Sequence, residues 1–119
     1  MLQDFSPGDY IVFQIESGYS LLRIIDIDLN EGDPIWHLAG YDEYFLDVES
    51  AESSIKDGRL PKPIPVHLVL TNRAFESTQT AKLFNVPLNE DDRESYLNWL
   101  ADADHEVSDR SVRLMLGLR

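Results

Sequence analysis

Three prolines close together, Pro61, Pro63 and Pro65, place the firmest limit on how this chain can fold. Each proline fixes its own φ and has no backbone N–H, so the segment excludes a helix and favours a stiff, extended link. Neither flank of the link is long enough for a comfortable core of its own in a chain of 119 residues. We therefore expect one domain, residues 1–119, with a rigid crossing.

Residues 5–48 are predicted to be rich in β-structure. The turn residues Ser6–Asp9 precede the β-branched and aromatic run 10–15. Residues 21–28 end on alternating Ile and Asp, as in a strand with one buried face. A short Gly-containing connection joins the two runs, which predicts a β-hairpin over residues 9–28.

A third strand is predicted over residues 35–41, with residues 44–46 as a candidate continuation. A Pro-Gly-Asp turn followed by short strands with Gly turns is similar to the opening of SH3-like small barrels. The resemblance covers roughly the first 48 residues and implies a fold without a function. We expect an α+β class, with a small antiparallel sheet or an SH3-like β-barrel in the N-terminal half.

The middle of the chain is predicted to hold one short helix and one further strand. Asp47 or Ser50 can cap a helix that ends near Lys56, and residues 49–65 comprise this helix and the proline-rich crossing. The apolar run after the crossing predicts a buried strand over residues 66–75. Residues 76–88 fit either a helical turn or a strand.

Residues 89–117 are predicted to be helical, with one or two helices. Asn89 can cap a helix, and the three acids after it suit the positive end of a helix dipole. An amphipathic helix is expected near residues 90–103, from the helical spacing of Tyr96, Leu97, Leu100 and Ala103, with Trp99 beside them. The last segment, residues 108–119, fits a short helix or a strand, and we choose the helix.

Charge is distributed unevenly along the chain. Residues 1–55 hold 12 acids and one base, residues 56–88 hold five bases and two acids, and residues 89–119 hold eight acids and four bases. The whole chain carries −12 at pH 7. Because phosphate binding relies on clustered Lys and Arg, this charge argues against a nucleic-acid partner, and it repels anionic membranes.

Composition and motifs exclude several kinds of catalytic and metal site. The chain has no cysteine, which excludes a disulfide framework, a thiolate metal site and a cysteine nucleophile. No serine lies in a Gly-x-Ser-x-Gly elbow, the glycines form no phosphate loop, and the histidines lack zinc-site spacing. We predict no cofactor and favour a non-enzymatic role, and we expect His37 and His67 to be hydrogen-bonded sheet residues.

Oxygen ligands are densest at Asp26, Asp28, Asn30, Glu31 and Asp33. The spacing begins like an EF-hand loop but places the glycine at Gly32, one position too late, and the flanks resemble strands. This pattern is more typical of a solvated strand face that ends in a polar turn. A divalent-metal protein or enzyme that uses Asp26, Asp28 and Asp33 remains an alternative.

Aromatic side chains are concentrated in the N-terminal half, where most are expected to fill the core. Tyr19 lies in a turn, and Tyr41 and Tyr44 flank two acids, so these three are the best candidates for exposure. Exposed rings among carboxylates would suit a basic peptide or a cationic group. The predicted binding face comprises Tyr19, Asp26, Asp28, Glu31, Tyr41, Asp42, Glu43 and Tyr44.

These patterns favour a non-catalytic, cytoplasmic module that binds a protein with a basic surface. An alternative is an acidic inhibitor or immunity-type protein that masks a nuclease or a DNA-binding surface. The cytoplasmic expectation follows from the absence of cysteine, of a signal-peptide pattern and of an apolar run long enough to span a membrane. A homo-oligomer is compatible with the same sequence.

Overall fold

The structure is a computed structural model that describes residues 5–15, 18–28, 33–59, 63–76 and 80–101. Its strands are β1 (Asp9–Ile15), β2 (Gly18–Asp28), β3 (Ile35–Phe45), β4 (Pro63–Thr71) and β5 (Thr80–Asn85). Its helices are α1 (Val48–Lys56), α2 (Asn72–Glu76), the 3₁₀ helix η1 (Asp91–Arg93) and α3 (Glu94–Ala101). The α+β class predicted from the sequence is confirmed. The predicted helix over residues 108–119 lies outside the described residues.

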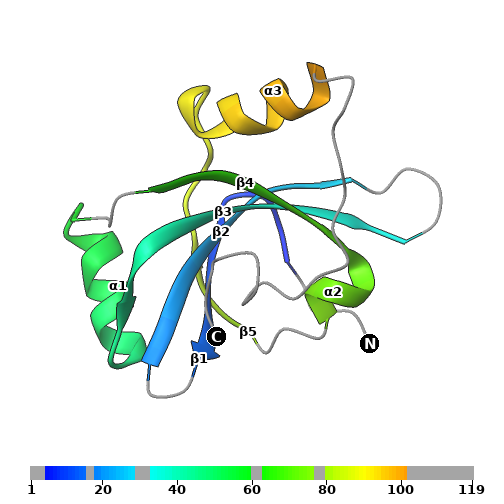
Figure 1. The fold of residues 1–119 in the computed structure, drawn as a ribbon. Coiled ribbons are helices and arrows are strands. Elements are labelled where there is room, and N and C mark those ends of the chain that lie inside the picture. Colours follow the sequence, from blue (N-terminus) through cyan, green and yellow to red (C-terminus); the bar gives the residue numbers. More distant parts are fainter. Residues whose placement is uncertain (1–4, 16–17, 29–32, 60–62, 77–79, 102–119) are drawn as a thin grey trace.

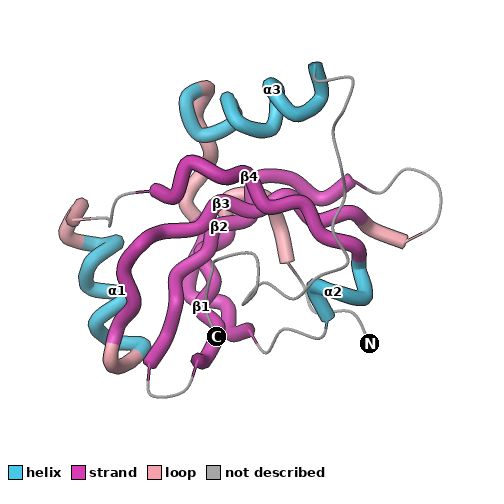
Figure 2. The backbone as a smooth tube through the Cα atoms, viewed as in Figure 1, coloured by secondary structure: helices cyan, strands magenta, loops and turns pink. Residues whose placement is uncertain are grey.

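The strands form one antiparallel sheet in the order β4-β3-β2-β1-β5. The chain runs from β1 to β4 as a meander, and β5 then returns to pair with β1 (Figure 1). Of the two alternatives for residues 76–88, the structure therefore contains the strand. As far as the structure describes them, β4 and β5 do not pair, so the curved sheet seen in Figure 2 is open.

The hairpin predicted over residues 9–28 is confirmed by the pairing of β1 with β2. Its register runs from Tyr10 opposite Arg23 to Ile15 opposite Gly18. The predicted third strand and its candidate continuation form a single strand, β3, which pairs with β2 through two register shifts.

The apolar core occupies both faces of the sheet. The first core cluster comprises Ile11, Phe13, Leu22, Ile24, Trp36, Leu38, Leu68, Leu70, Ala74 and Phe75. The second core cluster comprises Tyr10, Val12, Leu21, Tyr41, Phe45 and Ala51. Because successive side chains of a strand point to opposite faces, burial on both faces explains why Leu21 to Ile25 is an unbroken buried run.

Helix α1 covers the second core cluster with Ala51, Val48 and Ile55. Its start is fixed by Asp47, whose carboxylate accepts a hydrogen bond from the Ser50 backbone N–H at 2.7 Å. Hydrogen bonds from Ser50 hold the pKa of Asp47 below its usual range.

The strand predicted over residues 66–75 is wrong beyond Thr71, where β4 ends and α2 begins. The Thr71 hydroxyl accepts a hydrogen bond from the Ala74 backbone N–H at 3.2 Å, which starts a helical turn. That turn places Phe75 flat against Trp36, with ring centroids 3.8 Å apart. Aromatic packing in the first core cluster thus favours the helix over a longer strand.

The Ser-Pro-Gly-Asp turn ties β1 to the far end of β5. Asp9 is fully buried, and its carboxylate accepts hydrogen bonds from the Ser6 backbone N–H at 2.8 Å and the Asn85 side chain at 2.8 Å. The Lys82 ammonium lies 3.4 Å from the same carboxylate, so the buried charge is paired. Gly8 donates to the Ile24 carbonyl at 2.7 Å and accepts from the Val86 N–H at 3.1 Å.

Gly8 is predicted to be far less replaceable than Gly58, although both have positive φ angles of +94° and +70°. A Cβ at Gly8 would lie 2.6 Å from the Val86 carbonyl oxygen, whereas a Cβ at Gly58 meets nothing within 4 Å. Gly58→Ala should lower the free energy of unfolding by about 1 kcal/mol through its backbone conformation. Gly8→Ala should cost about 1–3 kcal/mol more, because the backbone at Val86 must shift. Urea unfolding of both variants provides the comparison, and equal losses would contradict the close approach.

Candidate functional site

Arg23 connects the sheet to the segment that leads into α3. Its side chain is 5% exposed, and its guanidinium donates to the Val86 carbonyl at 2.8 Å. It also pairs with the Asp92 carboxylate at 3.2 Å and lies over the Tyr10 ring, 4.6 Å from the centroid. These contacts hold the chain between β5 and η1 against β2, and so they set where α3 begins.

The start of η1 is closed by a reciprocal pair of hydrogen bonds. The Asp92 backbone N–H donates to the Asn89 side-chain oxygen at 2.8 Å, and the Asn89 N–H donates to the Asp92 carboxylate at 3.0 Å. This arrangement is a capping box with Asp92 in the position usually taken by Glu or Gln. Asp92 therefore both begins the helical segment and anchors it to Arg23.

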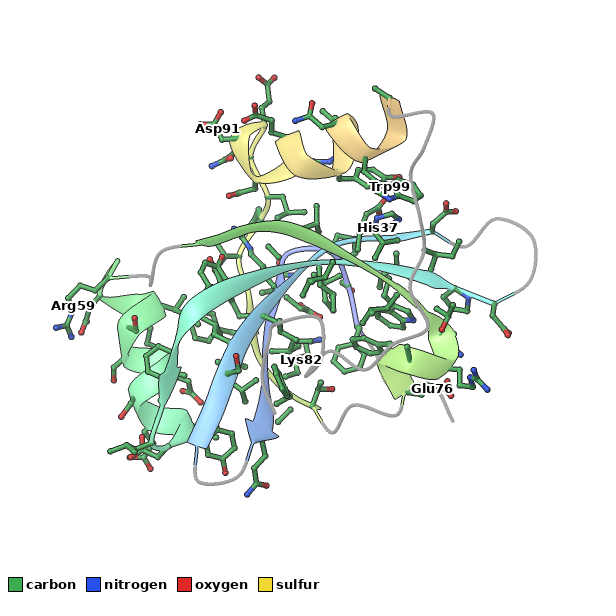
Figure 3. All side chains as sticks on the ribbon, viewed as in Figure 1. His37, Arg59, Glu76, Lys82, Asp91 and Trp99 are labelled. Carbon is green, nitrogen blue, oxygen red and sulfur yellow. The ribbon has the colours of Figure 1, made fainter. Side chains whose placement is uncertain are left out.

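Helix α3 rests on the sheet through two aromatic residues, Tyr96 and Trp99. Both rings meet the fully buried imidazole of His37 edge-on, at centroid distances of 4.6 Å and 4.8 Å. Figure 3 shows Trp99 and His37 together beneath the helix, with Asp91 near its other end. The contact joins α3 to β3, although His37 and Tyr96 are 59 positions apart in the sequence.

Tyr96 also joins α3 to the acids of β2. Its hydroxyl donates a hydrogen bond to the Asp26 carboxylate. Burial, this hydrogen bond and the negative charges of Asp26 and Asp28 raise the pKa of Tyr96 to about 12, while Arg93 opposes the rise. Tyr96 therefore joins the acidic end of β2 to α3, the helix that follows the acids Glu90 to Asp92.

We define the α3 face as the polar surface around Tyr96, together with the exposed Leu97. It comprises Asp26, Asp28, Glu90, Asp91, Glu94 and Leu97. Leu97 is 51% exposed, which contradicts its predicted place on the buried stripe of the helix. The helix turns Tyr96 and Trp99 toward the sheet instead, and this leaves Leu97 on the outer side.

The predicted binding residues are not all gathered at this face. Asp26 and Asp28 belong to it, whereas Tyr19 is half-buried and packs against the second core cluster. Tyr41 is 7% exposed, so the expectation that its ring lies on the surface is wrong. Burial and the neighbouring Tyr10 raise the pKa of Tyr41 above its usual range, as expected for a core phenol.

The side chains of the other predicted binding residues are not among those that the structure describes. Glu31 lies outside the described residues, and the structure describes the backbone of Asp42, Glu43 and Tyr44 within β3 but not their side chains. Within the described ranges, no three His, Asp or Glu side chains come together in a way that could hold a metal ion. Asp33 is exposed on the approach to β3.

A second surface feature lies beside α1. A cavity of about 350 Å³ is lined by Phe45, Ser50, Ser54 and Arg59. The Ser54 hydroxyl donates to the Arg59 carbonyl, and the Arg59 guanidinium pairs with Asp57 at 2.9 Å. Arg59 is exposed and points away from the molecule (Figure 3), so it adds little positive charge to the cavity.

Comparison with known proteins adds no identification, because no protein-family model, curated protein or solved structure matches this chain. Among the described residues, no helix is long and apolar enough to cross a membrane.

Sequence reasoning missed the role of His37, Tyr96 and Trp99 in joining the acidic end of β2 to α3. The spacing of Tyr96 and Trp99 places both on one side of a helix, which is a signal for a contact but not for its partner. That the partner is His37, beside Asp26 in the register of β2 and β3, depends on the fold.

The raised pKa of Tyr96 predicts a stability difference at alkaline pH. An unfolded tyrosine ionises near pH 10 and the folded Tyr96 near 12, so its contribution is fully present below pH 10 and is lost between these values. The stability advantage of the wild type over Tyr96→Phe should therefore shrink as pH rises from 10 to 12. Urea unfolding across this range measures the advantage, with neutral pH as the reference. An advantage that does not change with pH would contradict the proton-donating contact to Asp26.

Proposed function

We propose that this protein is a non-catalytic interaction module that binds a basic protein partner through the α3 face. The observation that carries the proposal is the contact through which Tyr96 joins the acidic end of β2 to α3, beside the exposed Leu97. Complementary charge of this kind mainly raises the association rate and selects the partner.

Four of the six described bases lie beside carboxylates of this chain. Arg23 pairs with Asp92, Lys82 with Asp9, Arg59 with Asp57 and Lys56 with Glu52, while Arg93 is exposed on η1 beside Tyr96. Glu90, Asp91 and Glu94 are exposed on the α3 face, where they are free to attract a partner's Lys or Arg side chains.

The α3 face also offers an apolar contact. Leu97 is 51% exposed on the outer side of the helix, whereas the Tyr96 ring is buried and the Arg93 guanidinium already lies 6.0 Å from its centroid. A partner that presents an apolar side chain among Arg and Lys would meet both Leu97 and the exposed acids.

The acidic-inhibitor alternative needs carboxylates spaced along one continuous surface, as phosphates are along nucleic acid. Exposed acids also occur on α1 and α2, at Glu49 and Glu76, and Figure 3 shows Glu76 and Asp91 on different sides of the molecule. This distribution favours the interaction module, and it supports a local acidic face over a mimic of a nucleic-acid backbone.

The proposal includes an SH3-like arrangement of the open sheet as the fold and the cytoplasm as the location. The strand order, in which β5 returns to β1 after the short helix α2, supports this fold assignment. The absence of cysteine supports a reducing compartment.

Binding to Arg-rich peptides that carry one apolar residue tests the proposal, with peptides in which Glu replaces Arg as the negative control. The variant Asp91→Asn/Glu94→Gln should weaken binding by about threefold to tenfold, because it removes two charges from the α3 face. The matched variant Glu49→Gln/Glu76→Gln removes the same charge from α1 and α2, and it should leave affinity nearly unchanged.

Fluorescence anisotropy at low and high salt provides the measurement, and affinity for the Arg-rich peptides should fall as salt rises. Equal weakening by the two variants, or affinity that is independent of salt, would contradict binding at the α3 face.

A further inference from the structure

The two edges of the open sheet differ in how they are protected against pairing with another strand. Edge strands expose unpaired backbone groups, and proteins protect them with proline, charged side chains or covering elements. β4 contains Pro63 and Pro65, neither of which has a backbone N–H to donate. Figure 1 also shows α3 over β4, so this edge has two forms of protection.

The β5 edge lacks both forms of protection within the described residues. β5, with the sequence Thr-Ala-Lys-Leu-Phe-Asn, contains no proline, and it pairs with β1 on its inner side. Its one charged residue, Lys82, turns its ammonium to the buried Asp9 carboxylate, 3.4 Å away. The Lys82 side chain is 41% exposed, and β5 carries a single charge that is already paired within the same molecule.

The side chains of β5 leave apolar surface available at this edge. Leu83 and Phe84 are only half-buried, Leu83 against the second core cluster and Phe84 near Tyr10, at a centroid distance of 6.2 Å. The Lys56 ammonium, which is 4.0 Å from the Glu52 carboxylate, lies over the Phe84 ring at 5.7 Å from its centroid.

We propose that the β5 edge pairs with the β5 edge of a second copy of this chain, antiparallel and about a two-fold axis. An edge strand is complementary to itself under such an axis, so the pairing needs no further partner. Charge favours this edge, because β5 itself contains one base, Lys82, and no acid. Two molecules of net charge −12 therefore meet with the least repulsion at β5.

The strength of this dimerisation should respond to salt in the opposite direction from peptide affinity at the α3 face. Screening weakens the general repulsion between two acidic molecules, so dimerisation should strengthen as salt rises. The dimerisation constant, measured by sedimentation velocity, should be about fivefold or more higher in about 0.5 M than in about 0.05 M sodium chloride.

A charge variant locates the interface. Ala81→Glu places an acid on each of two facing β5 strands, and it should lower the dimerisation constant by about tenfold or more. Ala81 is exposed, so the fold should tolerate the change. Ser53→Glu, at an exposed position on α1, adds the same charge elsewhere and should have little effect.

A single-cysteine variant provides an independent measurement, because the natural chain has no cysteine. Ala81→Cys should form a covalent dimer on mild oxidation much faster than Ser53→Cys. A protein that sediments as a monomer at every concentration and both salt levels would overturn the proposal. Dimers that Ala81→Glu leaves intact, or equal cross-linking of the two cysteine variants, would also overturn it.

Discussion

The buried guanidinium of Arg23 is the interaction on which the arrangement of this protein depends. A charge that is 5% exposed is costly unless it is paired, and here the Val86 carbonyl, the Asp92 carboxylate and the Tyr10 ring compensate it, although Arg23 Nε has no hydrogen-bond partner among the described residues. Removing one partner would leave the cation uncompensated, so the position of the segment after β5 is strongly restricted. The location of α3, and with it the α3 face, follows from this restriction.

A second buried charge works together with the first. Asp9 on β1 is paired with Lys82 on β5, and Gly8 beside it bonds to Val86, the residue whose carbonyl also contacts Arg23. The two pairs therefore hold opposite sides of one short segment. Each of these pairs joins one base to one acid, so the excess of 22 acids over ten bases is carried by the other residues. The pairs stabilise the fold, and the remaining acids produce the field that the proposed function uses.

Local sequence patterns predicted the strands more accurately than they predicted which side chains are exposed. The hairpin of β1 and β2 follows from turn residues and β-branched runs, which act over short distances. The helical turn of α2 was missed because it depends on Phe75 stacking against Trp36 from another strand. The exposure of Tyr41 was misjudged because its two acidic neighbours in the sequence do not decide which face of β3 meets α1. Tyr96 and Asp26 belong to segments that are distant in the sequence, so no local sequence pattern could predict their contact.

Hydrogen exchange of the α3 amides in Asp92→Asn, compared with Asp91→Asn, tests most directly whether the pair with Arg23 holds α3 in place. Both variants remove one negative charge from η1, but only Asp92 pairs with Arg23, at 3.2 Å. Asp92→Asn should accelerate exchange in α3 by about tenfold or more while the amides of β1 to β3 stay protected, because local opening becomes easier. Equal exchange of α3 in the two variants would contradict the central role of the Arg23 pair.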